Sequence, residues 1–167
     1  MTRLGHRDLS VAIHAGSLIR AWRPAASIAA VSEELIRAAA AYLNPVWVGD
    51  RWFGDVASAL VTADGAHFYG VCIDTGSGTG FCAEAAAIGA MVTAGERRIA
   101  QIVAVWRDPD TARLHVLPPC GRCRLFISQI HPDNAHQTMV VLGAEHQSVL
   151  ADLIPHQQWP PPLDASF

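Results

Sequence analysis

Segments with strand character alternate with segments of helical character along most of this 167-residue chain, which limits the folds open to it. Residues 56–63 and 67–73 read as strands and flank Asp64-Gly65, which predicts a β-hairpin with a tight turn. Six later segments continue the alternation: strands are expected at 98–106, 114–117 and 138–142, and helices at 81–94, 120–130 and 146–153. This pattern predicts an α/β fold, a three-layer α-β-α sandwich with a central mixed sheet.

Two amphipathic helices are expected before the hairpin. Apolar residues recur at helical spacing from Asp8, a candidate N-cap, to Pro24, and again over residues 28–42. We therefore predict that residues 1–45 form an N-terminal helical extension and that residues 46–167 form the main domain.

Composition and charge narrow the classes of partner. Hydrophobic residues make up 51% of the chain and charged residues only 16%, which suits one domain with a real core and predicts apolar faces that meet other subunits. The net charge is −3 and all twelve basic residues are arginine, so no basic face for nucleic acid is expected. No stretch approaches the roughly 20 apolar residues of a membrane-spanning helix. We expect a cytoplasmic protein with a small-molecule partner, without binding to nucleic acid or membrane.

Three cysteines stand at the starts of two expected helices. Cys120 and Cys123 are three residues apart, so both sulfurs can reach one metal ion from the first helical turn. A C-x-x-C pair alone can also be two buried cysteines or a redox motif. Cys82 favours a metal site, because it follows a glycine-rich loop at another helix start, with Glu84 two residues later. The partial positive charge at helix N-termini favours thiolates, and three ligands leave the open position typical of a catalytic zinc.

These residues carry a family resemblance. Cys82-Ala83-Glu84, followed by Pro119-Cys120-Gly121-Arg122-Cys123-Arg124, resembles the zinc signature of the cytidine deaminase superfamily. Residues 80–85 and 152–155 resemble the blasticidin S deaminases most, and small cytidine deaminases next. The resemblance implies Zn²⁺ on Cys82, Cys120 and Cys123, and a homotetramer. It also implies that Glu84 is the catalytic proton shuttle while zinc hydroxide attacks C4 of a cytosine ring and ammonia leaves.

The expected substrate contacts depart from the family pattern. Cys72-Ile73-Asp74-Thr75 stands where cytidine deaminases usually carry an Asn-x-Glu-Asn ribose clamp, and Ala85 stands where they carry an arginine, whose duty Arg122 is a candidate to take over. Six residues are candidates for substrate binding: Cys72, Asp74, Phe53, Ala83, Arg122 and Trp159. Core packing is the alternative for Cys72 and Phe53.

The sequence therefore predicts a zinc-dependent hydrolytic deaminase acting on a cytosine nucleoside or a nucleoside antibiotic of the blasticidin S type. One alternative is an ordinary cytidine or deoxycytidine deaminase. The other is a non-catalytic zinc-binding relative that acts as a binding module.

Overall fold

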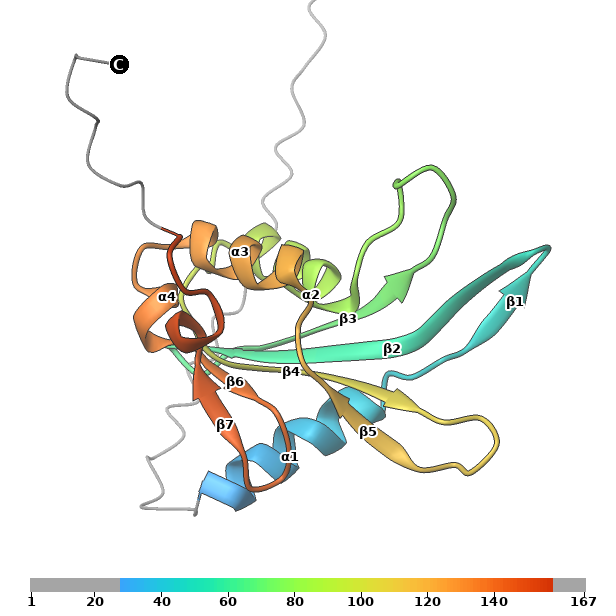
Figure 1. The fold of residues 1–167 in the computed structure, drawn as a ribbon, viewed down its shortest axis with the longest axis horizontal. Coiled ribbons are helices and arrows are strands. Elements are labelled where there is room, and N and C mark those ends of the chain that lie inside the picture. The colour runs from blue at the N-terminus through green and yellow to red at the C-terminus, as the bar shows by residue number, and fades with distance from the viewer. Residues whose placement is uncertain (1–27, 158–167) are drawn as a thin grey trace, which may run out of the picture.

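A seven-stranded mixed sheet forms the centre of the molecule in the computed structural model, which describes residues 28–157 (Figure 1). The main path across the sheet is β1 (Val46–Val48), β2 (Arg51–Thr62), β4 (Ile99–Arg107), β6 (Met139–Val141) and β7 (Gln147–Val149). Two more strands lie off this path, β3 (His67–Ile73) on β2 and β5 (Leu114–Leu117) on β4. Within the described residues only β4 and β6 pair in parallel. Helices cover both faces, so the predicted three-layer α/β sandwich is confirmed.

The predicted hairpin is formed by β2 and β3. Val61 pairs with His67 at its closed end, and Gly65 takes the positive φ of 85° that the turn requires. β2 begins at Arg51, five residues before the predicted segment, and it carries an irregularity between Phe53 and Ala57. Its early part pairs with β1, a three-residue strand that the sequence pattern did not predict.

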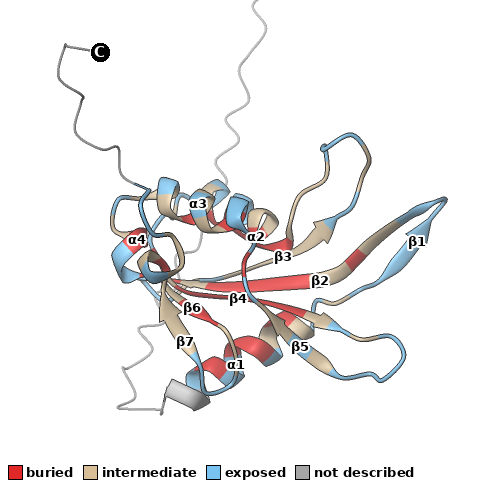
Figure 2. Ribbon diagram, in the orientation of Figure 1, coloured by how far each residue is buried: buried red, intermediate tan, exposed pale blue. Residues whose placement is uncertain are grey.

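One face of the sheet is covered by α1 (Ile28–Ala40), which lies within the predicted helix 28–42. Leu35 and Ala39 are buried there against Val103 and Val105 of β4. The helix predicted between Asp8 and Pro24 lies outside the described residues. A domain boundary near residue 45 stays a prediction, while α1 itself belongs to the core of the sandwich (Figure 2).

The other face is covered by α2 (Ala83–Thr93), α3 (Gly121–Ile130), the short α4 (Asn134–Gln137) and the 3-10 helix η1 (Leu150–Leu153). Leu60, Ile88 and Ile127 are fully buried in the core between these helices and the sheet. Gly70 of β3 allows α2 to lie directly on the strand, because a Cβ atom there would lie 2.3 Å from the backbone nitrogen of Ala87. These contacts set the positions of the starts of α2 and α3.

One predicted element is wrong. Residues 146–153 were expected to form a last short helix, but Gln147–Val149 form β7 and only Leu150–Leu153 form a helical turn, of the 3-10 type. Val149 pairs with Met139 of β6, so this segment satisfies its backbone hydrogen bonds across the sheet instead of along a helix. Among residues 28–157, no helix is both long and apolar enough to cross a membrane.

Candidate metal centre and substrate cavity

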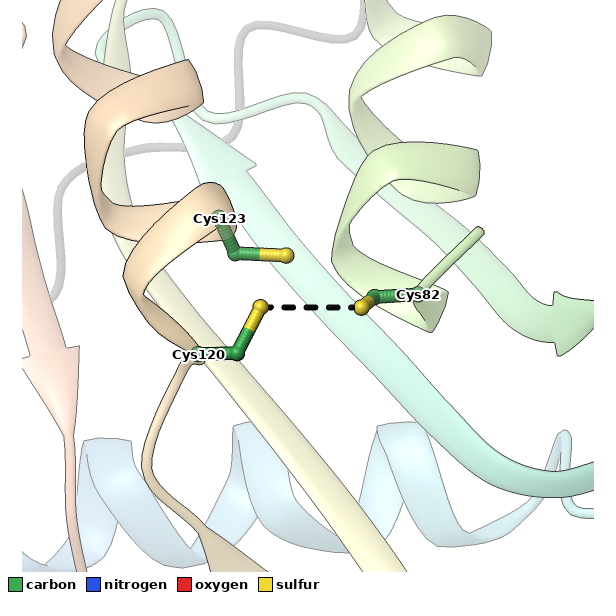
Figure 3. Close-up of side chains that lie close together, drawn as sticks. All are labelled: Cys82, Cys120 and Cys123. Carbon is green, nitrogen blue, oxygen red and sulfur yellow. Dashed lines mark hydrogen bonds between the residues drawn. The ribbon is translucent and has the colours of Figure 1, made fainter. Parts of the chain in front are cut away.

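Three cysteine sulfurs meet between the starts of α2 and α3 (Figure 3). Cys82 is the N-cap residue of α2, Cys120 is the N-cap residue of α3, and Cys123 lies in the first turn of α3. Their Sγ atoms all lie within 4.8 Å of one another, and the sulfurs of Cys82 and Cys120 are 3.7 Å apart. Thiolates about 2.3 Å from a tetrahedral zinc ion would be about 3.8 Å apart. The three sulfurs can therefore bind one metal ion.

The acidity of the three thiols shows why such a cluster needs a cation. Burial, and the neighbouring thiol of Cys120, raise the pKa of Cys82. Burial and the nearby carboxylate of Glu84 raise the pKa of Cys123 strongly. Burial also acts to raise the pKa of Cys120, but hydrogen bonds from Cys123 and Cys82 outweigh it, so that this pKa is lowered. Relative to an ordinary thiol, the surroundings thus favour the predicted thiolate form at Cys120 and disfavour it at Cys82 and Cys123. A bound cation would favour it at those two as well.

Glu84 lies one residue inside α2 and is only 6% exposed. Burial raises the pKa of its carboxyl, and a hydrogen bond with the Cys123 thiol acts in the opposite direction. A carboxyl group whose pKa is moved toward neutrality can both accept and donate a proton near physiological pH. Glu84 is therefore placed for proton transfer beside the sulfur cluster.

A cavity of about 400 Å³ opens next to Cys82. Three of the predicted substrate-binding residues, Cys72, Asp74 and Arg122, line this cavity. Further lining residues, which the sequence analysis did not select, are Val56, Thr75, Gly78, Gly80 and Phe81, together with Ile73. Most of them lie in the glycine-rich loop between β3 and α2, whose closeness to the cavity follows from its place directly before Cys82.

Cys72 is tied to the neighbouring strand. Its thiol donates to Oδ1 of Asp55 over 3.0 Å, and its sulfur accepts the backbone N–H of Val56 over 3.4 Å. Burial and the Asp55 carboxylate raise the pKa of the Cys72 thiol, so this residue stays protonated. Asp55 belongs to no recognisable sequence motif. Only its hydrogen bond with Cys72 in the folded chain identifies it as a neighbour of the candidate site.

Comparisons with known proteins agree with this geometry. No protein-family model matches the chain. Blasticidin-S deaminase from Bacillus cereus is 38% identical over 82 residues, which are 47% of this chain and 59% of that protein. The chain thus matches less than two thirds of this relative's length. Cytidine deaminase from Mycobacterium leprae has a TM-score of 0.58 and 26% identity over 74% of this chain and 96% of its own. Cytidine deaminase from Burkholderia pseudomallei has a TM-score of 0.57 and 28% identity over the same shares.

Together, these likenesses support a place for the chain in the cytidine deaminase superfamily. The remaining predicted substrate contacts lie less directly at the cavity. Phe53 is the cross-strand partner of Ile73, a residue of the cavity wall. Ala83 is fully buried, so only its backbone can reach a ligand. Trp159 lies outside the described residues. The binding roles of all six residues stay predictions.

The two arginines beside the cysteines differ in their surroundings. Arg122 is exposed at the start of α3 and faces the cavity, where it can balance thiolate charge. Arg124 instead donates to the carbonyl oxygens of Pro119 and Leu153, at 2.8 and 3.1 Å. Arg124 thus connects the start of α3 to η1 and supports the position of Cys120.

Proposed function

We propose that this chain is a zinc-dependent hydrolytic deaminase. It would convert the 4-amino group of a cytosine nucleoside, or of a nucleoside antibiotic of the blasticidin S type, to a carbonyl and release ammonia. The observation that carries the proposal is the convergence of three sulfurs with the buried carboxyl of Glu84, next to an open cavity.

Cys82, Cys120 and Cys123 would hold the zinc ion. When bound, zinc supplies Lewis acidity that makes water a nucleophile at neutral pH. Three thiolates donate more charge than one divalent cation neutralises, which weakens this acidity. Arg122, between Cys120 and Cys123 in the sequence, is the candidate to offset the excess negative charge.

Glu84 would move the protons of the reaction. Its carboxylate takes one proton from the attacking water as the new bond to C4 of the ring forms, and gives that proton to the neighbouring ring nitrogen. It then takes the second proton from the hydroxyl now on C4 and gives it to the amino nitrogen, so that ammonia leaves as the bond between C4 and that nitrogen breaks. Burial beside Cys123 suits Glu84 to both steps, because it brings the pKa of the carboxyl closer to neutrality.

The lining of the cavity supports a preference for a modified nucleoside over plain cytidine. Cys72 has one weak donor, and that donor is already used by Asp55, so this position cannot replace an amide that binds sugar hydroxyls. Asp74 adds a negative charge to the wall, which suits a hydroxyl or cationic substituent. We expect a blasticidin-type nucleoside to be turned over with higher kcat/KM than cytidine.

The first experiment measures ammonia release by the zinc-loaded protein from cytidine, deoxycytidine, cytosine and blasticidin S. Glu84→Gln should retain zinc and lose at least about a hundredfold in kcat, because proton transfer by a placed side chain contributes 10²–10⁴-fold. Glu145→Gln is the matched control, since Glu145 is exposed in the turn between β6 and β7.

Three outcomes would count against the proposal. No turnover of any substrate by zinc-loaded protein would favour the non-catalytic binding module. Full activity of Glu84→Gln would contradict only the proposed role of Glu84 in proton transfer. A cytidine preference of tenfold or more would return the chain to ordinary cytidine deamination.

We also propose that the protein works as a homotetramer in the cytoplasm. Hydrophobic residues make up 51% of the chain and charged residues only 16%, which supports apolar faces that meet other subunits. Light scattering should give the mass of four chains, and a stable monomer at micromolar concentration would contradict this assembly.

A further inference from the structure

A second and larger cavity, of about 650 Å³, lies beside the C-terminal end of α1. Its walls come from the end of α1, the β1–β2 hairpin and the turn between β4 and β5; they include Ala40, Leu43, Pro45, Trp47, Trp52, Asp55, Trp106 and Asp108. None of its lining residues lines the cavity beside Cys82. In Figure 1, α1 and the helices that carry the cysteines lie on opposite faces of the sheet.

Three tryptophans form much of this wall. The rings of Trp47 and Trp52 pack with their centroids 4.9 Å apart and a tilt of 40°, and both residues line the cavity. Trp106 packs against His115 at 5.5 Å. Trp47 is 64% exposed although it is a large apolar side chain. Tryptophan faces carry a negative electrostatic potential and attract cations more strongly than other aromatic rings do.

Two carboxylates complete the wall, from Asp55 on β2 and Asp108 after β4. The cationic side chain of Arg107 also reaches the cavity, but its guanidinium donates to the carbonyl oxygen of Ala112 at 3.0 Å across the turn. The wall therefore combines three tryptophan side chains with two carboxylates and one arginine whose guanidinium is hydrogen-bonded within its own turn. Both carboxylates already accept hydrogen bonds, Asp55 from the Cys72 thiol and Asp108 from Thr111 and the backbone of its turn. Their negative charges nevertheless disfavour an anionic ligand.

We propose that this cavity binds a small organic cation of the quaternary or substituted ammonium class. The methyl or methylene groups of such a cation would pack on the tryptophan rings, and its positive charge would be attracted by the ring faces and by Asp55 and Asp108. The two cavities share no wall residue and adjoin at the hydrogen bond between Cys72 and Asp55. The proposal does not depend on the deaminase activity, because the tryptophans and Asp108 lie outside the wall beside Cys82.

The test compares choline with 3,3-dimethyl-1-butanol, a neutral molecule of the same shape. Titration calorimetry on the full zinc-loaded chain, at constant ionic strength, should show saturable choline binding at least about tenfold tighter than binding of the neutral analogue. Absence of saturable choline binding would overturn the proposal, whether the cavity has too little affinity for choline or is covered by another subunit. Equal affinity for the two molecules would overturn it as well.

Variants then locate the site. Trp47→Leu keeps an apolar side chain but removes the aromatic face, and should weaken choline binding severalfold, whereas Trp47→Phe should retain part of the affinity. Asp108→Asn should also weaken binding, and Asp110→Asn in the same turn is its matched control because Asp110 does not line the cavity. Unchanged zinc content and circular dichroism establish that each variant is folded. Choline affinity that is unchanged in both Trp47→Leu and Asp108→Asn would overturn the assignment.

Discussion

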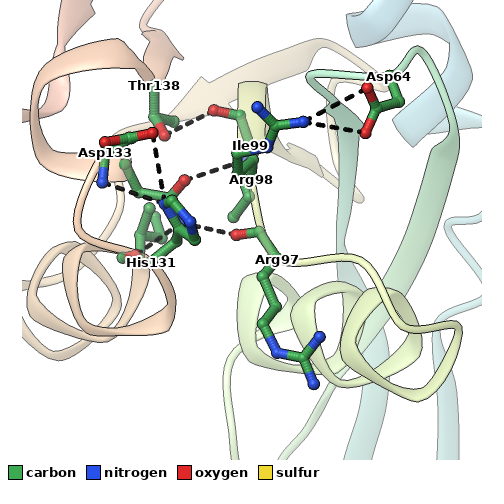
Figure 4. A network of polar contacts seen from close by, with 9 residues as sticks. Asp64, Arg97, Arg98, Ile99, His131, Asp133 and Thr138 are labelled. Carbon is green, nitrogen blue, oxygen red and sulfur yellow. Dashed lines mark hydrogen bonds and ion pairs between the residues drawn. The ribbon is translucent and has the colours of Figure 1, made fainter.

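Replacing Asn134 by alanine should cost about 3–7 kcal/mol of unfolding free energy. This side chain is 1% exposed and joins three segments around the start of β4. Figure 4 shows the polar contacts of this region, with Arg97 and Ile99 labelled. Its Oδ1 accepts the backbone N–H of Ile99 at 3.0 Å, and its Nδ2 donates to the carbonyl oxygens of Arg97 and Ile127 at 3.0 and 3.1 Å.

The magnitude follows from the three backbone groups that the substitution leaves without a hydrogen-bond partner. The contacts with Ile99 and Ile127 are buried, and a buried polar group without a partner costs about 1–3 kcal/mol. The contact with Arg97 is partly buried and contributes about 1 kcal/mol more. A loss near 4 kcal/mol would lower Tm by roughly 8–16 °C. Because Ile127 belongs to α3, the variant should also loosen the helix that carries Cys120 and Cys123 and weaken metal binding.

Urea unfolding followed by circular dichroism measures the loss of unfolding free energy in Asn134→Ala. The zinc affinity of the variant is the second measurement. The control is Gln129→Ala, which removes an exposed amide from α3 and should change stability by no more than about 0.5 kcal/mol. A loss below 1 kcal/mol in Asn134→Ala would refute the reasoning, because it would mean that the three backbone groups find other partners.

Three further predictions concern the packing of α2, the β4–β5 turn and the metal. Gly70→Ala would place a Cβ atom 2.3 Å from the backbone of α2 and should lower the unfolding free energy by at least about 1–3 kcal/mol. Gly89→Ala is the control, because a Cβ atom there meets nothing within 4 Å and should not destabilise the protein. Thermal unfolding of the two variants measures the difference. Hydrogen bonds from Thr111 hold the pKa of Asp108 below its usual range, so their stabilising effect is present above the ordinary aspartate pKa and is lost as pH falls through the lowered one. NMR titration should show this low midpoint, and Thr111→Val should raise it; an unchanged midpoint would contradict the assignment. Zinc should raise the Tm of the wild type and not that of Cys123→Ala, as scanning calorimetry would show, and an equal rise in both would exclude Cys123 as a ligand.

The sequence alone determined the features that depend on a few neighbouring residues. Asp64-Gly65 specifies a tight turn, and the β-branched and aromatic residues on either side of it specify the strands of the hairpin, so this element was predicted correctly. The spacing of Cys120 and Cys123 places both sulfurs on one helical turn wherever the helix lies. The resemblance to deaminases linked them to Cys82, which stands 38 positions before Cys120 in the chain.

Tertiary structure decided what depends on partners distant in sequence. Residues 147–149 become a strand because β6 offers hydrogen bonds, and β1 forms because β2 continues back to Arg51. The hydrogen bond between Cys72 and Asp55 and the cavity with three tryptophans likewise join segments that are distant in the chain. No local sequence pattern predicts that these segments meet. Local preferences in such short segments differ by a few tenths of a kcal/mol per residue, less than one satisfied hydrogen bond or one buried side chain contributes, so long-range packing decides their structure.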